Sequence, residues 1–234
     1  MEPIVRVNDL VQKIGPRTIL QGISFAVLPG ECWGVFGSRG AGKTSLLHIL
    51  AGVDRFTTGQ VEILGSDIRK TENFKRHLGL VTEENSMFAD LTVGENLDFI
   101  AALKAASPID VREMLERYEL REHLSEPVKA INSGVLQRLA MACAMLNRPR
   151  LLLVDDIINN INLYSRHLIL RELQQFQAGG GTCICSCSSV DFFRYVTRVA
   201  WLEDGRISLY EPEAARAEWE RQEKMYSEPS DRDA

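Results

Sequence analysis

The chain lacks any apolar stretch of about 18 residues, so no segment is predicted to span a bilayer as a helix. Its first residues, Met1 to Leu10, carry acidic side chains and no apolar core, and they do not resemble a secretory signal. The formal net charge of −5 argues against a nucleic-acid-binding surface. We therefore expect a protein that folds in the cytosol and reaches a membrane only through a partner.

Cysteine is also scarce, and the five residues are an odd number, which predicts reduced thiols in a chain without a signal. Three of them alternate between Cys183 and Cys187, so on a strand their thiols would point to one face. Two interpretations stay open: small buried hydrophobic side chains, or metal or redox chemistry. The first is favoured, because metal sites usually show Cys-x-x-Cys pairs with further ligands.

The remaining pattern is that of an α/β protein. With 234 residues, 45% hydrophobic and 25% charged, the chain is long enough for one large domain with a buried core. Alternation predicts strands at residues 4–7, 23–27, 32–36, 182–187, 199–202 and 207–210, and a buried strand at 151–154. Helical spacing predicts helices at 92–106, 108–120, 135–146 and 165–177, and a charged surface helix begins near residue 211.

The strongest motif follows the strand at 32–36. It has the form G-x-x-x-x-G-K-[ST] and comprises Gly37, Ser38, Arg39, Gly40, Ala41, Gly42, Lys43, Thr44 and Ser45. In such a phosphate loop, successive backbone N–H groups face a β-phosphate, the lysine reaches the β/γ oxygens and the Thr44 hydroxyl ligates Mg²⁺. The following helix presents its positive N-terminal end to the same charge. Arg39 is either a phosphate contact or a solvated loop charge.

A second carboxylate element is needed to hold Mg²⁺. The apolar run from Leu151 to Val154 ends in Asp155 and Asp156, which places two carboxylates at the end of a buried strand. Asp155 is therefore the predicted metal partner of Thr44, and the pair predicts Mg-ATP binding.

Together these motifs resemble those of the ABC transporter ATPases over about residues 4 to 210. Residues 90–97, Asp-Leu-Thr-Val-Gly-Glu-Asn-Leu, are similar to ATPases that drive ABC-2-type exporters. The resemblance implies an α/β P-loop NTPase fold with a RecA-like core, an N-terminal antiparallel β-subdomain and a helical insert. It divides residues 1–226 into a core at about 1–82 and 147–210 and a helical subdomain at about 83–146, followed by a disordered tail at 227–234.

The resemblance also assigns roles that several residues here depart from. The family's signature loop, which clasps the nucleotide of the opposite subunit, corresponds to Asn132, Ser133 and Gly134 instead of a Ser-Gly-Gly sequence. The catalytic glutamate is replaced by Asp156, and the Q-loop glutamine by Glu83, whose carboxylate would still face Mg²⁺. The remaining departures are a missing switch histidine, with Ser188 or Ser189 in its place, Asn162 in the D-loop, and Ile14 where an aromatic ring would stack on adenine.

These departures predict that ATP binding survives while hydrolysis falls by on the order of 100-fold. One interpretation is a transport motor that dimerises with another ABC ATPase, as a homo- or heterodimer, and moves a membrane permease, with export favoured. The other is a degenerate structural or regulatory subunit paired with a competent ATPase. A soluble ABC ATPase of translation or DNA repair ranks last, because the chain has no tandem fusion or long coiled coil.

The expected location of the protein is cytoplasmic and peripheral, on the inner face of the cell membrane, where the permease would hold it.

Overall fold

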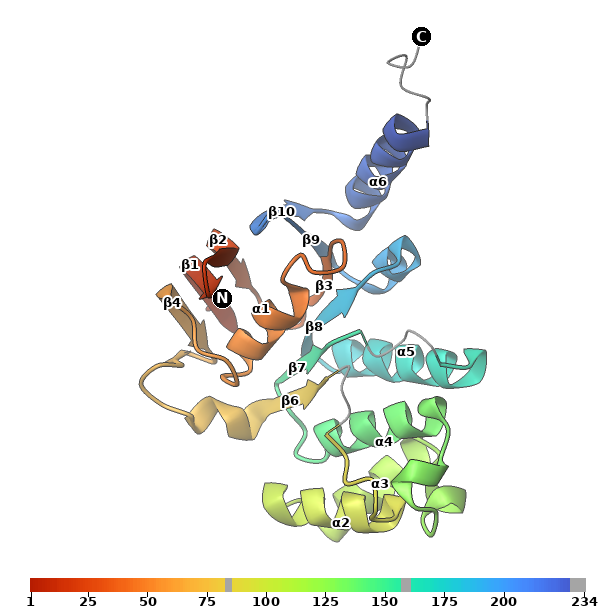
Figure 1. The fold of residues 1–234 in the computed structure, drawn as a ribbon. Helices are drawn as coiled ribbons and strands as arrows, with labels where there is room; N and C mark the ends of the chain where they lie inside the picture. Colours follow the sequence, from red (N-terminus) through yellow and green to blue (C-terminus); the bar gives the residue numbers. More distant parts are fainter. Residues whose placement is uncertain (83–85, 157–160, 228–234) are drawn as a thin grey trace.

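The structure is a computed structural model that describes residues 1–82, 86–156 and 161–227. Two β-sheets and six α-helices form the described part of the fold (Figure 1). The strands are β1 (Val5–Ile14), β2 (Arg17–Val27), β3 (Cys32–Phe36), β4 (Thr58–Ile63), β5 (Ser66–Asp67), β6 (Leu78–Val81), β7 (Leu151–Val154), β8 (Thr182–Cys187), β9 (Arg198–Glu203) and β10 (Arg206–Tyr210). The α-helices are α1 (Lys43–Leu50), α2 (Val93–Lys104), α3 (Pro108–Arg117), α4 (Ser133–Met145), α5 (Leu163–Ala178) and α6 (Pro212–Ser227). Short 3₁₀ helices lie at Asn73–His77, Arg121–His123, Val128–Ala130 and Val190–Tyr195.

The six-stranded sheet carries the core of the fold. Its strand order is β10-β9-β3-β8-β7-β6, and all neighbours are parallel except the β9–β10 hairpin, which turns at Asp204 and Gly205. The central strands β3, β7 and β8 are buried on both faces, as expected for a parallel sheet covered on each side. One face packs against α1 and the antiparallel sheet β2-β1-β4-β5, and the other packs against α4 and α5.

Helices α2, α3 and α4 lie together at one side of the molecule (Figure 1), and α4 connects this group to β6 and α5. Both α2 and α3 begin with capping boxes, in which Thr92 pairs with Glu95 and Ser107 pairs with Asp110. Each cap satisfies backbone N–H groups that the first helical turn leaves without partners. No described helix is both long enough and apolar enough to cross a membrane.

The predicted fold class is confirmed, with differences in length. The first two strands are longer than predicted: β1 continues to Ile14 and β2 begins at Arg17. Register shifts between the two strands, the first between Val7 and Leu10, interrupt the alternation on which the prediction rested. β4, β5 and β6 were not predicted. The charged helix near residue 211 is confirmed as α6. The tail predicted at 227–234 is wrong at its first residue, because Ser227 ends α6, and residues 228–234 lie outside the described part of the chain.

The cysteines give one confirmation and one correction. All five are buried, as small hydrophobic residues would be. Cys32 and Cys183, however, form a disulfide, so the expectation of five reduced thiols is wrong for this pair. The two residues are directly opposite each other on the neighbouring strands β3 and β8, with their Cα atoms 4.6 Å apart, a separation that a disulfide spans. Their spacing in the sequence carries no sign of this pairing.

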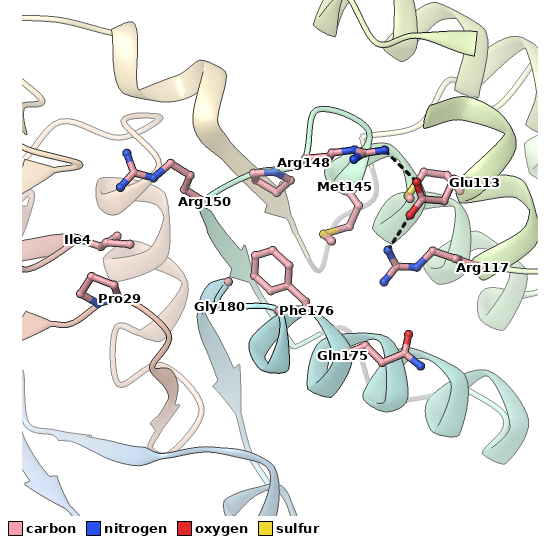
Figure 2. A pocket seen from close by; sticks show the side chains of 14 residues that line it. Ile4, Pro29, Glu113, Arg117, Met145, Arg148, Arg150, Gln175, Phe176 and Gly180 are labelled. Carbon is pink, nitrogen blue, oxygen red and sulfur yellow. Dashed lines mark hydrogen bonds and ion pairs between the residues drawn. The ribbon is translucent and has the colours of Figure 1, made fainter. Parts of the chain in front are cut away.

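Charged side chains join the helical layer to the core. Glu172 on α5 is 2% exposed, and its carboxylate accepts hydrogen bonds from Arg117 Nε of α3 at 2.7 Å and from Arg171. Arg117 also contacts Glu113, which in turn binds Arg148 (Figure 2). A buried carboxylate that loses its cation is costly, because nothing else replaces its hydration.

We predict that Arg117→Met lowers the free energy of unfolding by about 3 kcal/mol, because Glu172 would remain buried with one guanidinium fewer. The matched control is Arg121→Met, since Arg121 pairs with Glu116 at the exposed surface and should contribute less than about 1 kcal/mol. Urea unfolding of both variants measures the difference. Equal effects would show that the Arg117–Glu172 pair has no special role.

Candidate functional site

The phosphate loop connects β3 to α1, and its geometry requires glycine at two points. A Cβ on Gly37 would lie 2.3 Å from the Leu202 carbonyl oxygen of the neighbouring strand. A Cβ on Gly42, where φ is +108°, would lie 2.9 Å from Ile19 Cγ2. The loop is therefore fitted closely against β9 and β2, which fixes the point at which α1 begins.

Lys43 is the first residue of α1, and its ammonium group closes the loop. Lys43 Nζ donates to the carbonyl oxygens of Gly37 at 2.7 Å and of Ser38 at 3.0 Å. The first hydrogen bond of the helix runs from Leu46 N to Gly42 O. The N–H groups of Lys43, Thr44 and Ser45 thus precede the helical ladder at its positive end, which is an arrangement suited to an anion.

A buried carboxylate faces this loop from the end of β7. Asp155 is 1% exposed, and its Oδ1 accepts a hydrogen bond of 2.6 Å from the Ser186 hydroxyl of β8. The Ser186 oxygen also accepts from the Asp156 backbone N–H at 2.8 Å. Ser186 therefore fixes both the orientation of Asp155 and the start of the segment that follows it.

The second oxygen of Asp155 indicates what the site can hold. Asp155 Oδ2 is buried and has no hydrogen-bond partner within the described part of the chain. A buried, ionisable oxygen without a partner is costly unless a ligand satisfies it. Carboxylate and hydroxyl oxygens are the ligands that Mg²⁺ prefers, so Asp155 and Thr44, which line the same cavity, fit this ion.

These groups meet in an open cavity of about 430 Å³. Its lining comprises Ile19, Arg39, Gly40, Gly42, Lys43, Thr44, Ser45, Asp155, Asp156, Ser186 and Ser188. The structure thus brings most of the predicted loop, the predicted metal ligands Thr44 and Asp155, Asp156 and Ser188 at the switch position into one cavity. Backbone N–H groups, an ammonium group and a helix N-terminus on one side, with carboxylates on the other, are suited to a polyphosphate with a divalent cation.

Other predicted site residues lie elsewhere. Ile14 ends β1 with 58% of its surface exposed and does not line the cavity, so its contact with adenine stays a prediction. Glu83, predicted to be catalytic and to bind metal, lies outside the described residues.

The predicted signature residues form the N-terminus of α4, away from the cavity lining. Asn132 is the N-cap, and its side-chain oxygen accepts from Val135 N at 3.1 Å. Gly134 packs against α5, since a Cβ there would lie 2.5 Å from Ser165 Oγ and 2.9 Å from Asn162 Nδ2. Asn162 in turn caps α5. The two asparagines thus fix neighbouring helix starts, a role that their side chains perform well.

Sequence reasoning missed two contributors to the site. Ser186 is a polar residue in the otherwise apolar second half of β8. Its polarity could have suggested a role in the site, but the role depends on the pairing of β8 with β7, the strand that leads into Asp155. Ile19 belongs to the exposed antiparallel sheet and reaches the cavity only because Gly42 allows close approach. That second contact depends on how the two sheets pack, which no local pattern encodes.

Comparison with known proteins agrees with this geometry. The family model described as "ABC transporter" matches residues 20–159. A Nod factor export ATP-binding protein I of Ralstonia nicotianae is 30% identical over 78% of this chain. A spermidine/putrescine import ATP-binding protein of Protochlamydia amoebophila is 32% identical over 70% of this chain. The alignments span 58% and 45% of these relatives, so the chain matches about half the length of each.

Solved structures give the same answer for the fold. A dimeric ATP-binding cassette bound to ADP and Pi superposes with a TM-score of 0.82 at 22% identity, covering 89% of this chain and 98% of the other. The family model covers more than half of the chain, and it spans the phosphate loop and both aspartates at the end of β7. The chain therefore belongs to the ABC transporter family, as one of its ATP-binding domains.

Proposed function

We propose that this chain is the Mg-ATP-binding subunit of an ABC transporter and that it couples nucleotide binding to a membrane permease. The observation that carries the proposal is the convergence of Lys43, the N-terminus of α1 and Asp155 on one cavity. The name of the exporter relative supports the same role, and residues 90–97 favour export over import. Because one of the relatives is named as an import protein, the proposed direction of transport rests on residues 90–97 alone.

The proposed nucleotide contacts follow from the geometry. The N–H groups at the start of α1 would bind the β-phosphate, and Lys43 would exchange the Gly37 and Ser38 carbonyls for phosphate oxygens. Thr44 and the partnerless Oδ2 of Asp155 would hold Mg²⁺. When bound, Mg²⁺ neutralises charge on the phosphate oxygens. Ile19 at the rim would contact the nucleotide, and Ile14 would offer apolar contact without an aromatic face.

Hydrolysis is proposed to be weak. A general base must reach the attacking water within hydrogen-bond distance, and Asp156 has one methylene fewer than the glutamate found in the family. Its backbone φ of +46° fixes the direction of this shorter side chain. Ser188 lines the cavity where the family has an imidazole, and a hydroxyl does not span the same distance to a γ-phosphate.

Dimerisation is the second part of the proposal. The solved relative is a dimer bound to ADP and Pi. In this chain Asn132, Ser133 and Gly134 lie away from its own cavity, so they would serve a nucleotide held by a partner ABC ATPase. Asn132 uses its side-chain oxygen to cap α4, which leaves an amide where the family presents a serine hydroxyl.

The permease is proposed to dock beside residues 83–90. Among the described residues, a cavity of about 170 Å³ is lined by Val81, Thr82, Ser86 and Met87 and by residues of α2 and α4. Phe88 and Phe99 stack edge to face at 5.1 Å and remain 47% and 44% exposed. Exposed aromatic side chains beside a groove suit an apolar helix of a partner. Such docking would give the chain a peripheral place on the inner face of the cell membrane.

A second candidate function is favoured by the number of departures at the catalytic positions. In it, the chain binds ATP as a structural or regulatory subunit and forms a heterodimer with a competent ATPase. The partner would then supply an intact signature loop to this chain's phosphate loop. Turnover of the chain alone separates the two candidates when it is compared with turnover in the presence of an ABC ATPase and a permease, where adjacent genes encode them. Robust turnover by the chain alone would exclude the second candidate.

We predict that Lys43→Ala weakens ATP binding by about 10- to 100-fold, because it removes a charge-assisted contact to the phosphates. Lys70→Ala is the matched control, since Lys70 pairs with Asp67 on an exposed edge. Calorimetric titration in magnesium buffer measures both affinities. Similar affinities for Lys43→Ala and the wild type would contradict the proposed site.

We predict that Asp156→Glu raises ATP turnover by about 10-fold or more, because the longer side chain reaches the attacking water. Asp98→Glu, on the exposed face of α2, is the control for a generic effect of the substitution. Phosphate release under saturating ATP is the measurement. If turnover stays the same or falls in Asp156→Glu, the short base is not what limits hydrolysis.

A further inference from the structure

Three cysteine sulfur atoms lie close together on the face of the six-stranded sheet that packs against α4 and α5, and none of them lines the proposed nucleotide cavity. Cys32 lies on β3, Cys183 and Cys185 lie on β8, and their Sγ atoms are all within 4.8 Å of one another. All three face the layer of α4 and α5 and are at most 2% exposed. Cys32 and Cys183 are joined as a disulfide, and Cys185 stays free.

The position of the disulfide connects it to the site. β3 runs from Cys32 directly into the phosphate loop, and β8 runs from Cys183 to Ser186, which orients Asp155. A bond between Cys32 and Cys183 therefore ties together the two strands that carry opposite sides of the nucleotide cavity. Without it, only backbone hydrogen bonds and packing join these strands.

We propose that Cys32 and Cys183 are an oxidative modification site, a reversible disulfide that locks the nucleotide-binding core. The sequence separation of 151 residues makes this link a strong constraint on the unfolded chain, because the loss of chain entropy grows with loop length. The inference goes beyond the proposed function, since the link forms or breaks whether or not the chain moves a permease.

A peroxide can oxidise the two thiols to the disulfide in two balanced steps. The sulfur of one thiolate attacks a peroxide oxygen, the O–O bond breaks, and a sulfenic acid and hydroxide form. The second sulfur then attacks the sulfenic sulfur; the S–S bond forms, the S–O bond breaks and a second hydroxide leaves. The protons of the two thiols convert both hydroxides to water, and two electrons pass from the cysteines to the peroxide. An added dithiol reverses the bond by exchange.

A route for a small oxidant exists at the amino ends of the same strands. An open cavity of about 560 Å³ is lined there by Pro29, Phe176 and the glycines 179–181 (Figure 2). Pro29 precedes Cys32 by three residues, and Gly181 precedes Cys183 by two. A peroxide that enters this cavity needs only a local opening at the ends of β3 and β8 to reach the sulfurs.

The neighbouring thiol does not compete with the pair. Cys185 lies two residues further into β8 than Cys183, so a local opening at the strand ends frees Cys32 and Cys183 to ionise and leaves Cys185 buried. Burial raises the pKa of Cys185 to about 12, and it also raises the pKa of Cys187. Exchange requires a thiolate, so a protonated Cys185 leaves the Cys32–Cys183 bond in place. The pair thus gives one defined product and not a mixture of disulfides.

The test begins with the intact chain treated with hydrogen peroxide or with dithiothreitol. We expect the oxidised form to lack two hydrogen atoms in mass, to give one cross-linked peptide pair containing Cys32 and Cys183, and to show a Tm roughly 5 to 15 °C above the reduced form. Cys32→Ala should abolish this difference, and Cys143→Ala, which alters another buried thiol on α4, should keep it.

Comparison of the two redox forms needs no variant, so a folding defect in Cys32→Ala leaves the test intact. Five alkylatable thiols after peroxide treatment of the folded chain would overturn the proposal. So would a cross-link to Cys185, or a metal ion retained by the purified chain and lost in Cys32→Ala.

One further measurement tests the lock itself and depends on the proposed nucleotide site. Reduction requires the strands to open, so ATP at about 100 times its Kd should slow reduction by dithiothreitol by up to about 100-fold. Lys43→Ala should lose this protection while it keeps the disulfide. Protection absent from a wild type that binds ATP would refute the lock, whereas a disulfide without any ATP binding would refute only the proposed function.

Discussion

The buried carboxylate of Asp155 is the constraint on which the site depends. It lies at the end of β7, receives one hydrogen bond from Ser186 and keeps its other oxygen without a partner among the described residues. Burying such a group costs free energy that folding alone does not return. A cation bound between Asp155 and the Thr44 hydroxyl, which line the same cavity, would offset this cost. The strand that leads into Asp155, β7, is buried on both faces, which restricts the movement of this carboxylate.

The same sheet explains why the site tolerates change at some positions. Phosphate binding relies on backbone groups and Lys43, and their arrangement is set by the close approach of Gly37 to β9 and of Gly42 to β2. In the function we propose, hydrolysis would instead depend on the reach of individual side chains, such as Asp156 and Ser188. Shorter side chains at those positions would remove reach without disturbing the fold. The proposed subunit would then keep its nucleotide site while its hydrolysis weakens, and it would work with a partner.

Much of this could be predicted from the sequence, and the limits have physical causes. The phosphate loop, Asp155 and the helices α2 to α5 follow from local patterns, such as the glycine spacing and the Ser107-Pro108 cap. Ser186 and the Cys32–Cys183 disulfide follow from which strands are neighbours, and the order β3-β8-β7 joins segments that are far apart in the chain. β1 and β2 were too short in the prediction, because register shifts between the two strands interrupt the alternation of polar and apolar residues.

The most direct test of the account is the effect of magnesium on ATP affinity in the wild type and in Asp155→Asn. The account predicts that the wild type binds ATP more tightly with Mg²⁺ than with a chelator, and that Asp155→Asn keeps the metal-free affinity but loses most of the gain. A wild type that fails to bind ATP in magnesium buffer, or an equal gain in Asp155→Asn, would contradict it.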